Sequence, residues 1–458
     1  MKRKSWLAGM VLGMAGALVA GEAGTGVTLD GCIATALKAN PDVKSATARV
    51  KAAQAAVREA SSAYYPSLGL AGNWTRTDNP PQAFFMSLNQ RRASLQKDFN
   101  NPEDTENLRG SVVAQWRLYD GGRREADRQA ARGGAEAAGH LMDSVQNDLA
   151  YQVIRAYHGV LQVRDMMKVR DEEVKSITET LRLATERHKA GAALKSDVLN
   201  LEVHLAQSNE ELIRARNSLQ FAVAVLNTAI GQQRVGMNDV AGMTAGDAVA
   251  VSTNTASSGV ESRPELRMAG AQVKASEAMV SRARREYLPV VSAFGSLDWD
   301  SETFSGPERS YLAGAAVELN LFDGFRTRAG VARASAGAAQ ARAEVEKLAS
   351  ALTLDLTRAR LNEQEARERL EVAGKSLASA AESLRITRER YSQGAADITE
   401  LMAAQVAFTA NQTRQVAGQY DTLIAHADVE RAEGALGEKW GSPTDTARQA
   451  SPSKRGDP

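Results

Sequence analysis

The sequence is poor in the residues and motifs that catalytic and metal sites require. Its single cysteine, Cys32, cannot form an internal disulfide, and the chain has neither a Cys-x-x-Cys pair nor a Cys/His zinc spacing. The five histidines show no metal spacing, and no HExxH, GxSxG or phosphate-loop motif is present. These absences predict a protein that is not an enzyme and has no cofactor and no metal site.

The chain also has almost no net charge and few aromatic residues. Its 56 basic and 55 acidic side chains leave a formal charge of +1, so no nucleic-acid partner is expected. Aromatic residues make up only 5% of the 458 residues, whereas alanine, leucine, glutamate and arginine dominate long stretches. This composition is typical of long packed helices.

Long hydrophobic runs are missing after the N-terminus. The first 23 residues combine Lys2, Arg3 and Lys4 with a short apolar segment and small residues, which predicts a secretory signal peptide at 1–23. Beyond it, no stretch offers the roughly 20 apolar residues that a membrane-crossing helix needs. If the exported protein enters a membrane, we expect it to do so as a β-barrel. Cys32 fits a lipid-attachment site poorly, so lipidation is not expected.

An internal repeat organises the rest of the chain. Landmarks of the first half recur in the second, at a displacement of 223 residues (Pro41 to Pro264) that falls to 203 residues (Gly191 to Gly394). The change in displacement places a 20-residue insertion in the first half, between Trp74 and Gly110. The paired landmarks are Pro41 and Pro264, Pro66 and Pro289, Asp120-Gly121 and Asp323-Gly324, and Gly191 and Gly394.

These landmarks predict the domain organisation. The first repeat spans 24–231 and the second 263–440, with a connector at 232–262 and a disordered tail at 441–458. Each repeat is expected to contain a helix that ends before Pro66 or Pro289, two strands, and a long helical hairpin. The first helix is expected to run from Leu29 to about residue 63.

The strands and the hairpins follow from periodicity. Alternating segments predict strands at 67–77, 108–118, 290–299 and 311–321, with an exposed loop at 77–107. Asp120 and Asp323 are candidate helix caps, after which heptad patterns predict helices of about 100 Å. The helical hairpins are expected to turn at 191–197 and 394–400. Aromatic residues near the strand ends predict an interfacial belt of Trp74, Trp116, Tyr119, Phe294, Trp299 and Phe322.

Four strands are too few for a closed barrel. The smallest outer-membrane barrels have about eight strands, because an open edge in lipid leaves backbone groups unpaired. A single chain therefore cannot close, whereas two, three or four copies could. The expected fold class is mainly α with a β-barrel part that several copies complete.

The chain from 27 to 440 resembles the TolC-like outer-membrane factor family of efflux and type I secretion systems. The resemblance rests on Leu-Asp-Gly-Cys-Ile-Ala-Thr-Ala-Leu-Lys-Ala-Asn-Pro at 29–41, Tyr-Tyr-Pro at 64–66, Leu-Tyr-Asp-Gly-Gly, Leu-Phe-Asp-Gly-Phe, and two Gly-x5-[Asp/Glu] turns. It implies a homotrimer with a twelve-stranded barrel in outer-membrane lipid and a long α-helical barrel in the periplasm. The connector would lie at an equatorial level. The implied partners are a periplasmic adaptor and an inner-membrane transporter.

The resemblance also implies roles for residues at the helical turns. Asp197 and Glu400 would line a periplasmic aperture, and Tyr391 with its counterpart His188 would take part in closed-state contacts. The turns themselves, with Gly191, Leu194, Gly394 and Ile398, would contact the adaptor. Ala396 stands where the family has a gate-locking arginine, and Arg187, Arg388 and Arg390 are the candidate replacements.

Two alternatives remain open at the level of the sequence. Asp197 and Glu400 could instead be acids that favour the start of the returning helix through its dipole. The whole protein could also be a soluble periplasmic coiled-coil adaptor without a pore, since such a protein needs a helical hairpin too.

Overall fold

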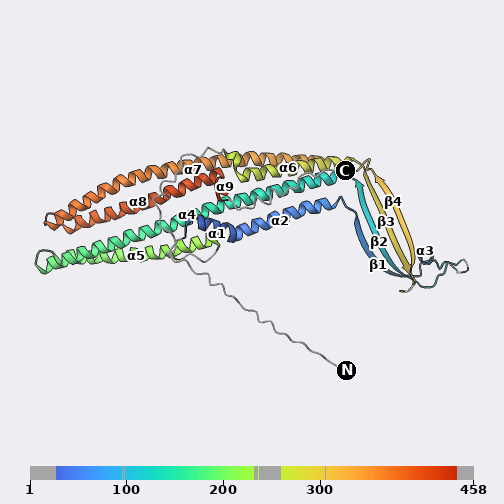
Figure 1. The fold of residues 1–458 in the computed structure, drawn as a ribbon, viewed down its shortest axis with the longest axis horizontal. Coiled ribbons are helices and arrows are strands. Elements are labelled where there is room, and N and C mark those ends of the chain that lie inside the picture. Colours follow the sequence, from blue (N-terminus) through green and yellow to red (C-terminus); the bar gives the residue numbers. More distant parts are fainter. Residues whose placement is uncertain are drawn as a thin grey trace, which may run out of the picture.

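The computed structural model is a long helical rod with a four-stranded sheet at one end (Figure 1). It describes residues 27–231 except 95, 97 and 99, residue 236, and residues 259–440 except 305. The expected signal peptide at 1–23, most of the connector at 232–262 and the tail at 441–458 lie outside these residues.

Two helical hairpins of matching length form the rod. Helices α4 (Arg123–Lys189) and α7 (Arg326–Ser392) have 67 residues each, and α5 (Lys195–Ile230) and α8 (Ile398–Glu433) have 36 each. Each helix of the second hairpin starts 203 residues after its counterpart, which is the displacement of the sequence landmarks. At 1.5 Å per residue, a 67-residue helix extends about 100 Å.

Shorter helices pack along the rod between its middle and the sheet. One of them lies along α4, and its counterpart in the second repeat packs against both α4 and α7 (Figure 1). These two are α2 (Pro41–Ser62) and α6 (Pro264–Arg284); the others are α1 (Leu29–Ala39), α9 (Leu436–Trp440) and the 3-10 turns η1 (Val260–Ser262) and η2 (Arg285–Tyr287).

Two expectations about helices were wrong. The helix expected from Leu29 to about residue 63 breaks at Asn40, because Pro41 holds the preceding residue in an extended conformation and Asn40 caps the next helix by accepting from the Asp42 amide. The expected loop at 77–107 contains helix α3 (Pro80–Asn89). Its Asn-Pro start is a cap followed by proline in the first turn, a combination that begins helices.

The sheet is antiparallel, with strand order β1-β2-β3-β4. The strands are β1 (Ser67–Thr77), β2 (Thr105–Tyr119), β3 (Val290–Ser301) and β4 (Glu308–Glu318). Strand β2 starts earlier than expected because Thr105 pairs with Thr77. Strand β4 ends at Glu318 rather than 321 because that residue pairs with Val290, the first residue of β3 after Pro289.

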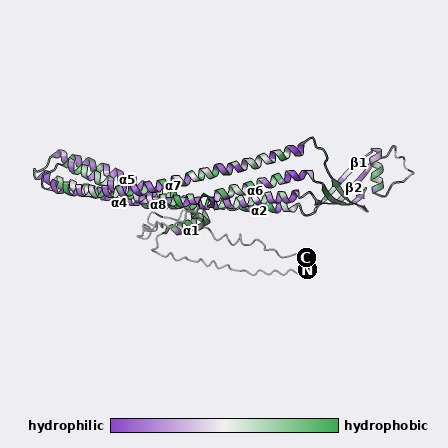
Figure 2. Ribbon diagram, turned by 90° about the horizontal axis from the view of Figure 1, so that it is seen from above, coloured by the Kyte–Doolittle hydropathy of each residue, from purple (hydrophilic) through white to green (hydrophobic). Residues whose placement is uncertain are grey.

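The main core lies midway along the rod. There α1 packs against α4 and α5, and α9 packs against α4. The cluster also includes residues of α8 and contains Ile33, Leu149, Leu226, Tyr420 and Leu436, all nearly inaccessible to solvent. Elsewhere hydrophobic and hydrophilic residues are closely interspersed along the helices (Figure 2). None of the described helices is both long and apolar enough to cross a lipid bilayer.

Candidate functional site: the helical tips and the two-faced sheet

The two helical hairpins turn through the same backbone conformation. Gly191 and Gly394 adopt φ values of +77° and +75°, which only glycine reaches without strain. In both turns the next amide, of Ala192 or Ala395, donates 2.8 Å to the carbonyl five residues earlier. This is a Schellman cap, which satisfies the last carbonyls of α4 and α7.

The predicted acids lie in the first turns of the returning helices, Asp197 in α5 and Glu400 in α8. Neither side chain caps its helix. Asp397 caps α8 instead, because its Oδ1 accepts from the Glu400 amide at 2.7 Å, whereas its counterpart Leu194 offers no side-chain cap. The sequence signal for this cap was Asp397 followed three residues later by Glu400.

An arginine joins the tips of the two hairpins. Arg187, near the end of α4, donates from Nη1 to the Tyr391 carbonyl at 3.0 Å and from Nη2 to the Ser392 carbonyl at 2.7 Å. Its guanidinium also lies over the Tyr391 ring, 5.1 Å from the centroid. His188, the counterpart of Tyr391, lies instead against the Ala193 carbonyl of its own turn.

The other two candidate arginines are engaged as well. Arg388 contacts Ser176 across the hairpins at 3.2 Å, and Arg390 pairs with Glu400 at 3.4 Å while donating to the Ala395 carbonyl. The Arg390 and Glu400 side chains are both about half exposed. Arg187 and Arg388 therefore link the hairpins, whereas Arg390 links the two arms of one hairpin.

An apolar cluster from both hairpins lies behind the tips. Its buried members come from α4, α5, α7 and α8 and are Ile177, Ala184, Leu201, Leu384, Ile398, Leu401 and Met402. Ile398 is only 5% exposed, so its side chain packs inside the chain and does not belong to the predicted docking surface. Leu194 is 69% exposed and is available for such contacts.

The sheet has one apolar and one polar face. Residues that face each other across the ladders share a face, so the register separates the two sets of side chains. The apolar set includes Leu68, Leu70, Trp74, Leu108, Val112, Trp116, Val291, Leu297, Trp299, Tyr311 and Val317. The polar set includes Asn73, Thr75, Asn107, Arg109, Ser111, Gln115, Ser292, Ser296, Asp298, Asp300 and Ser310.

The polar face is tied together by charged and hydrogen-bonded groups. Arg109 pairs with Asp300 at 2.8 Å, and the Asn107 amide donates to the same carboxylate at 2.6 Å. Ser111 donates to Asp298 at 2.6 Å. Such a face suits water, whereas the opposite face suits lipid.

The register corrects part of the predicted aromatic belt. Trp74, Trp116 and Trp299 lie on the apolar face, but Phe294 lies on the polar face, where its ring covers Gly314 of the neighbouring strand. Phe294 and Trp299 are an odd number of positions apart, so a strand must point them in opposite directions. Tyr119 follows a register shift at the end of β2, and Phe322 lies beyond β4 with its side chain 74% exposed.

The residues predicted at the helix–strand transitions lie at strand starts and helix starts. Pro66 and Pro289 immediately precede β1 and β3. The Asp120 carboxylate accepts from the amides of Gly122 and Arg124, and Asp323 accepts from the Thr327 amide, so both aspartates stabilise helix starts. Gly121 and Gly324 both have positive φ.

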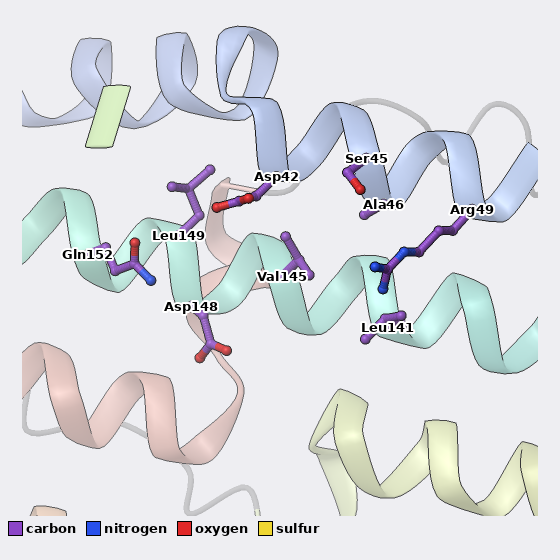
Figure 3. A pocket seen from close by; sticks show the side chains of 9 residues that line it. All are labelled: Asp42, Ser45, Ala46, Arg49, Leu141, Val145, Asp148, Leu149 and Gln152. Atoms are coloured by element: carbon purple, nitrogen blue, oxygen red, sulfur yellow. The ribbon is translucent and has the colours of Figure 1, made fainter. Parts of the chain in front are cut away.

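A cavity between α2 and α4 carries no converging ligand set. Its lining includes Asp42, Arg49 and Asp148, but Figure 3 shows their side chains directed to different sides of the two helices. Burial raises the pKa of Asp148 above its ordinary value. Within the described residues, no group of three or more histidine, cysteine, aspartate or glutamate side chains could hold a metal ion.

Comparison with known protein families shows which family has this architecture. A profile described as outer membrane efflux protein matches residues 32–232 and 256–435, which is most of the chain. The chain belongs to the outer membrane efflux protein family. Its members are outer-membrane channels rather than enzymes, and the chain is accordingly an outer-membrane channel of efflux or secretion. This assignment replaces the alternative of a soluble adaptor.

The chain is also similar, at low sequence identity but over most of its length, to individual proteins and solved structures. Protein CyaE of Bordetella pertussis is 25% identical over 398 residues, which cover 83% of this chain and 78% of CyaE. Outer membrane efflux protein BepC of Brucella suis is 23% identical over 437 residues, covering 94% and 91%. The crystal structure of the outer membrane protein VceC from Vibrio cholerae superposes with a TM-score of 0.73 at 18% identity, covering 89% of this chain and 96% of VceC.

Proposed function

We propose that three copies of this chain close into one tube that conducts solutes from the periplasm through the outer membrane. The observation that carries this proposal is the four-stranded sheet with one apolar face, one polar face and two unpaired edge strands, β1 and β4. An unpaired edge in lipid is costly because each backbone group there lacks a partner. Three copies supply twelve strands, and their polar faces line a water-filled lumen.

The number of copies comes from the family rather than from the sheet. Two or four copies would also close a barrel, but the TolC-like proteins that the sequence resembles are trimers. The long helices continue from the strands at Asp120 and Asp323, so the same three copies continue the tube into the periplasm.

The tube has its constriction at the helical tips. A ring of three copies brings together three Asp197 and three Glu400 side chains, and their mutual repulsion is opposed by arginines that bind neighbouring carbonyls and carboxylates. Arg187 holds the end of α7, and Arg390 neutralises part of the charge of Glu400. An acidic aperture of this kind favours cations.

The same tips form the docking surface for a periplasmic adaptor, which connects the tube to an inner-membrane transporter. Support comes from the exposed turns, where a side chain added at Gly191 or Gly394 would meet no atom within 4 Å. Leu194 adds an exposed apolar contact beside the first turn. In this proposal the transporter supplies the energy for export.

The acidic aperture is tested by the double variant Asp197→Ala, Glu400→Ala in planar-bilayer measurements. With a salt gradient across the bilayer, we expect the wild type to be cation-selective and the variant to lose roughly half or more of its reversal potential. The matched control is Glu210→Ala, Glu371→Ala, which removes the same charge from the helix shafts, where both acids are ion-paired. Unchanged selectivity in the tip variant, or an equal loss in the control, would contradict the proposed aperture.

A further inference from the structure

A cavity lies at the helix–strand junction of the second repeat, where α6 leads into β3 and β4 leads into α7 (Figure 1). Its volume is about 840 Å³. The two helices leave this space because several of the residues that line it are small, namely Ala283, Ala329, Gly330 and Ala334. A side-chain carbon placed on Gly330 would meet no atom within 4 Å. We call this space the junction cavity.

Arginine dominates the charged lining of the junction cavity. Four arginines and two glutamates line it, so the lining has a formal excess of two positive charges. These six residues are Arg123, Arg282, Arg326, Arg333, Glu286 and Glu318.

The arginines differ in how far acids neutralise them. Arg282 pairs with Asp127 at 2.8 Å and with Glu286 at 3.2 Å, so its charge is balanced. Arg123 donates instead to three backbone carbonyls of the other repeat. Carbonyl groups carry no net charge, so the positive charge of Arg123 stays uncancelled.

Arg326 and Arg333 line the cavity from α7. Arg326 is 77% exposed and lies 3.8 Å from Asp323, and an exposed pair at this distance is weak. Arg333 forms no ion pair or hydrogen bond with any residue that the structure describes. The two arginines are seven positions apart, about two helical turns, so they share one face of α7. Their guanidinium groups are therefore available to an anion in the cavity.

The junction cavity opens on the polar side of the sheet. Val290 and Glu318 line the cavity and face each other across β3 and β4. Val290 lies two positions from Ser292 of the polar set, so its side chain and that of Glu318 point to the same side as Ser292. In the proposed tube this side faces the lumen.

The first repeat forms the same kind of junction without this charge. The counterpart of Arg282 in the first repeat is Glu59, and the counterpart of Arg333 is Ala130. A helix leads into a strand and a strand into a helix in both repeats, so the junction does not need these arginines in order to fold. This difference favours a role in binding.

We propose that the junction cavity binds the phosphate or carboxylate groups of anionic solutes in the lumen. Guanidinium groups suit such anions because their forked donors can bind two oxygen atoms at once. A concave site with an excess of one charge also concentrates ions of the opposite charge. The position in the lumen rests on the proposed tube, whereas the binding of anions rests on the cavity alone.

The junction cavity is electrostatically independent of the proposed acidic aperture. The cavity lies at the start of α7, and the aperture lies beyond its end, about 100 Å away at 1.5 Å per residue. This separation is many times the Debye length of about 8 Å at physiological salt. Variants at one site should therefore leave the other unchanged.

Block of conductance by tripolyphosphate tests the site in a planar bilayer. The probe is added on the barrel side, from which it reaches the junction without passing the helical tips. We expect a concentration-dependent block of the wild type, and a half-blocking concentration about tenfold higher for Arg333→Glu, because hydrogen bonds to a charged group are lost. The matched control is Arg328→Glu, an exposed arginine of the same helix outside the cavity lining, which should change the value by less than about twofold.

Isothermal titration calorimetry measures the same binding without conduction. Tripolyphosphate is titrated into the detergent-solubilised full-length protein. We expect the dissociation constant of Arg333→Glu to rise by about tenfold and that of Arg328→Glu to stay within about twofold of the wild type. Arg333→Lys should lie between the wild type and Arg333→Glu, because lysine keeps the charge but lacks the forked donors.

The outcomes separate the anion site from the proposed function. Channels that conduct ions but show neither block nor calorimetric binding of tripolyphosphate would overturn the site and leave the tube intact. Binding that depends on Arg333 in a protein that forms no channel would support the site and overturn the tube. Equal losses in Arg333→Glu and Arg328→Glu would overturn the site, because a general charge effect would then explain them.

A lipid headgroup is the other source of a phosphate group, and a further measurement distinguishes it. Mass spectrometry of the purified protein counts the phosphatidylglycerol that remains bound. We expect Arg333→Glu to retain as much of this lipid as the wild type. Loss of the lipid in Arg333→Glu, with unchanged binding of tripolyphosphate, would show that the cavity faces the bilayer and would overturn the proposal.

Discussion

Asn40 and Arg263 occupy the same place in the two repeats, the residue before the proline that starts α2 or α6, but they form different contacts. Asn40 donates from its amide to the Ala229 carbonyl at 2.8 Å. Arg263 is 3% exposed and pairs with Asp355 of α7 at 3.0 Å, and Arg431 of α8 pairs with the same carboxylate at 3.1 Å. The start of α6 in the second repeat is therefore held by ion pairs, whereas the start of α2 in the first repeat is held by a hydrogen bond between neutral groups.

Replacing Asp355 by Asn is expected to destabilise the protein at neutral pH by about 2 kcal/mol, because two arginines lose a shared carboxylate in a largely buried place. Burial alone would raise the pKa of Asp355, but hydrogen bonds from Arg263 and the charge of Arg431 lower it below its ordinary value of 3.8. A lowered pKa stabilises the folded state above that ordinary value, and the stabilisation is lost as the pH falls through the lowered pKa. The measurement is the unfolding midpoint of the helical signal as a function of pH.

The difference between wild type and Asp355→Asn should thus persist down to about pH 3.8, shrink as the pH falls further, and vanish below the lowered pKa. The control is Asp171→Asn, which removes one half of an exposed pair with Lys175 and should not shift the midpoint measurably. A difference between wild type and Asp355→Asn that persists unchanged to low pH would contradict this account of the charge network.

Some residue-level features could be found in the sequence and others could not. The face of Phe294 follows from counting five positions to Trp299, and the cap at Asp397 follows from its spacing to Glu400, so both signals were local. The contact of Arg187 with Tyr391 joins residues 204 positions apart, and the meeting of Arg263 with Asp355 spans 92. Contacts of that range depend on how the hairpins pack, which periodicity does not specify.

At the scale of elements, the positions of the helices and strands were predicted mainly from the duplicated landmarks. Proline, Asp-Gly and glycine mark places where the backbone must stop, cap or turn, so their repetition predicted where α4 and α7 start and where they turn into α5 and α8. The errors arose where proline has two roles. Pro41 starts α2, but the sequence predicts a single helix that runs through it. Pro80 starts α3, but the sequence predicts a loop there.

Glycines at helix ends are expected to differ in their tolerance of alanine. Gly394→Ala places a residue at φ +75° with no clash, and should cost about 1 kcal/mol from backbone strain alone. Gly231→Ala has the same φ, but its Cβ would lie 2.9 Å from the Asn40 Cα, so we expect a cost of about 3 kcal/mol. Thermal unfolding monitored by circular dichroism shows which of the two variants is less stable. Equal midpoints would show that the contact at Asn40 relaxes without cost.

At the scale of the whole molecule, one chain does not form a closed barrel. Its sheet has an apolar face and two open edges, and large apolar side chains of α7 such as Leu361 and Val372 are exposed. The sequence predicted the open sheet, because two hairpins supply only four strands.

Electron microscopy of the purified full-length protein in lipid nanodiscs tests the central claim most directly. The account predicts particles with three copies around one axis, a twelve-stranded barrel inside the disc, and a helical tube that projects from one side and narrows at the Gly191 and Gly394 turns. Particles that contain a single copy, or rings whose strands lie outside the lipid, would contradict it.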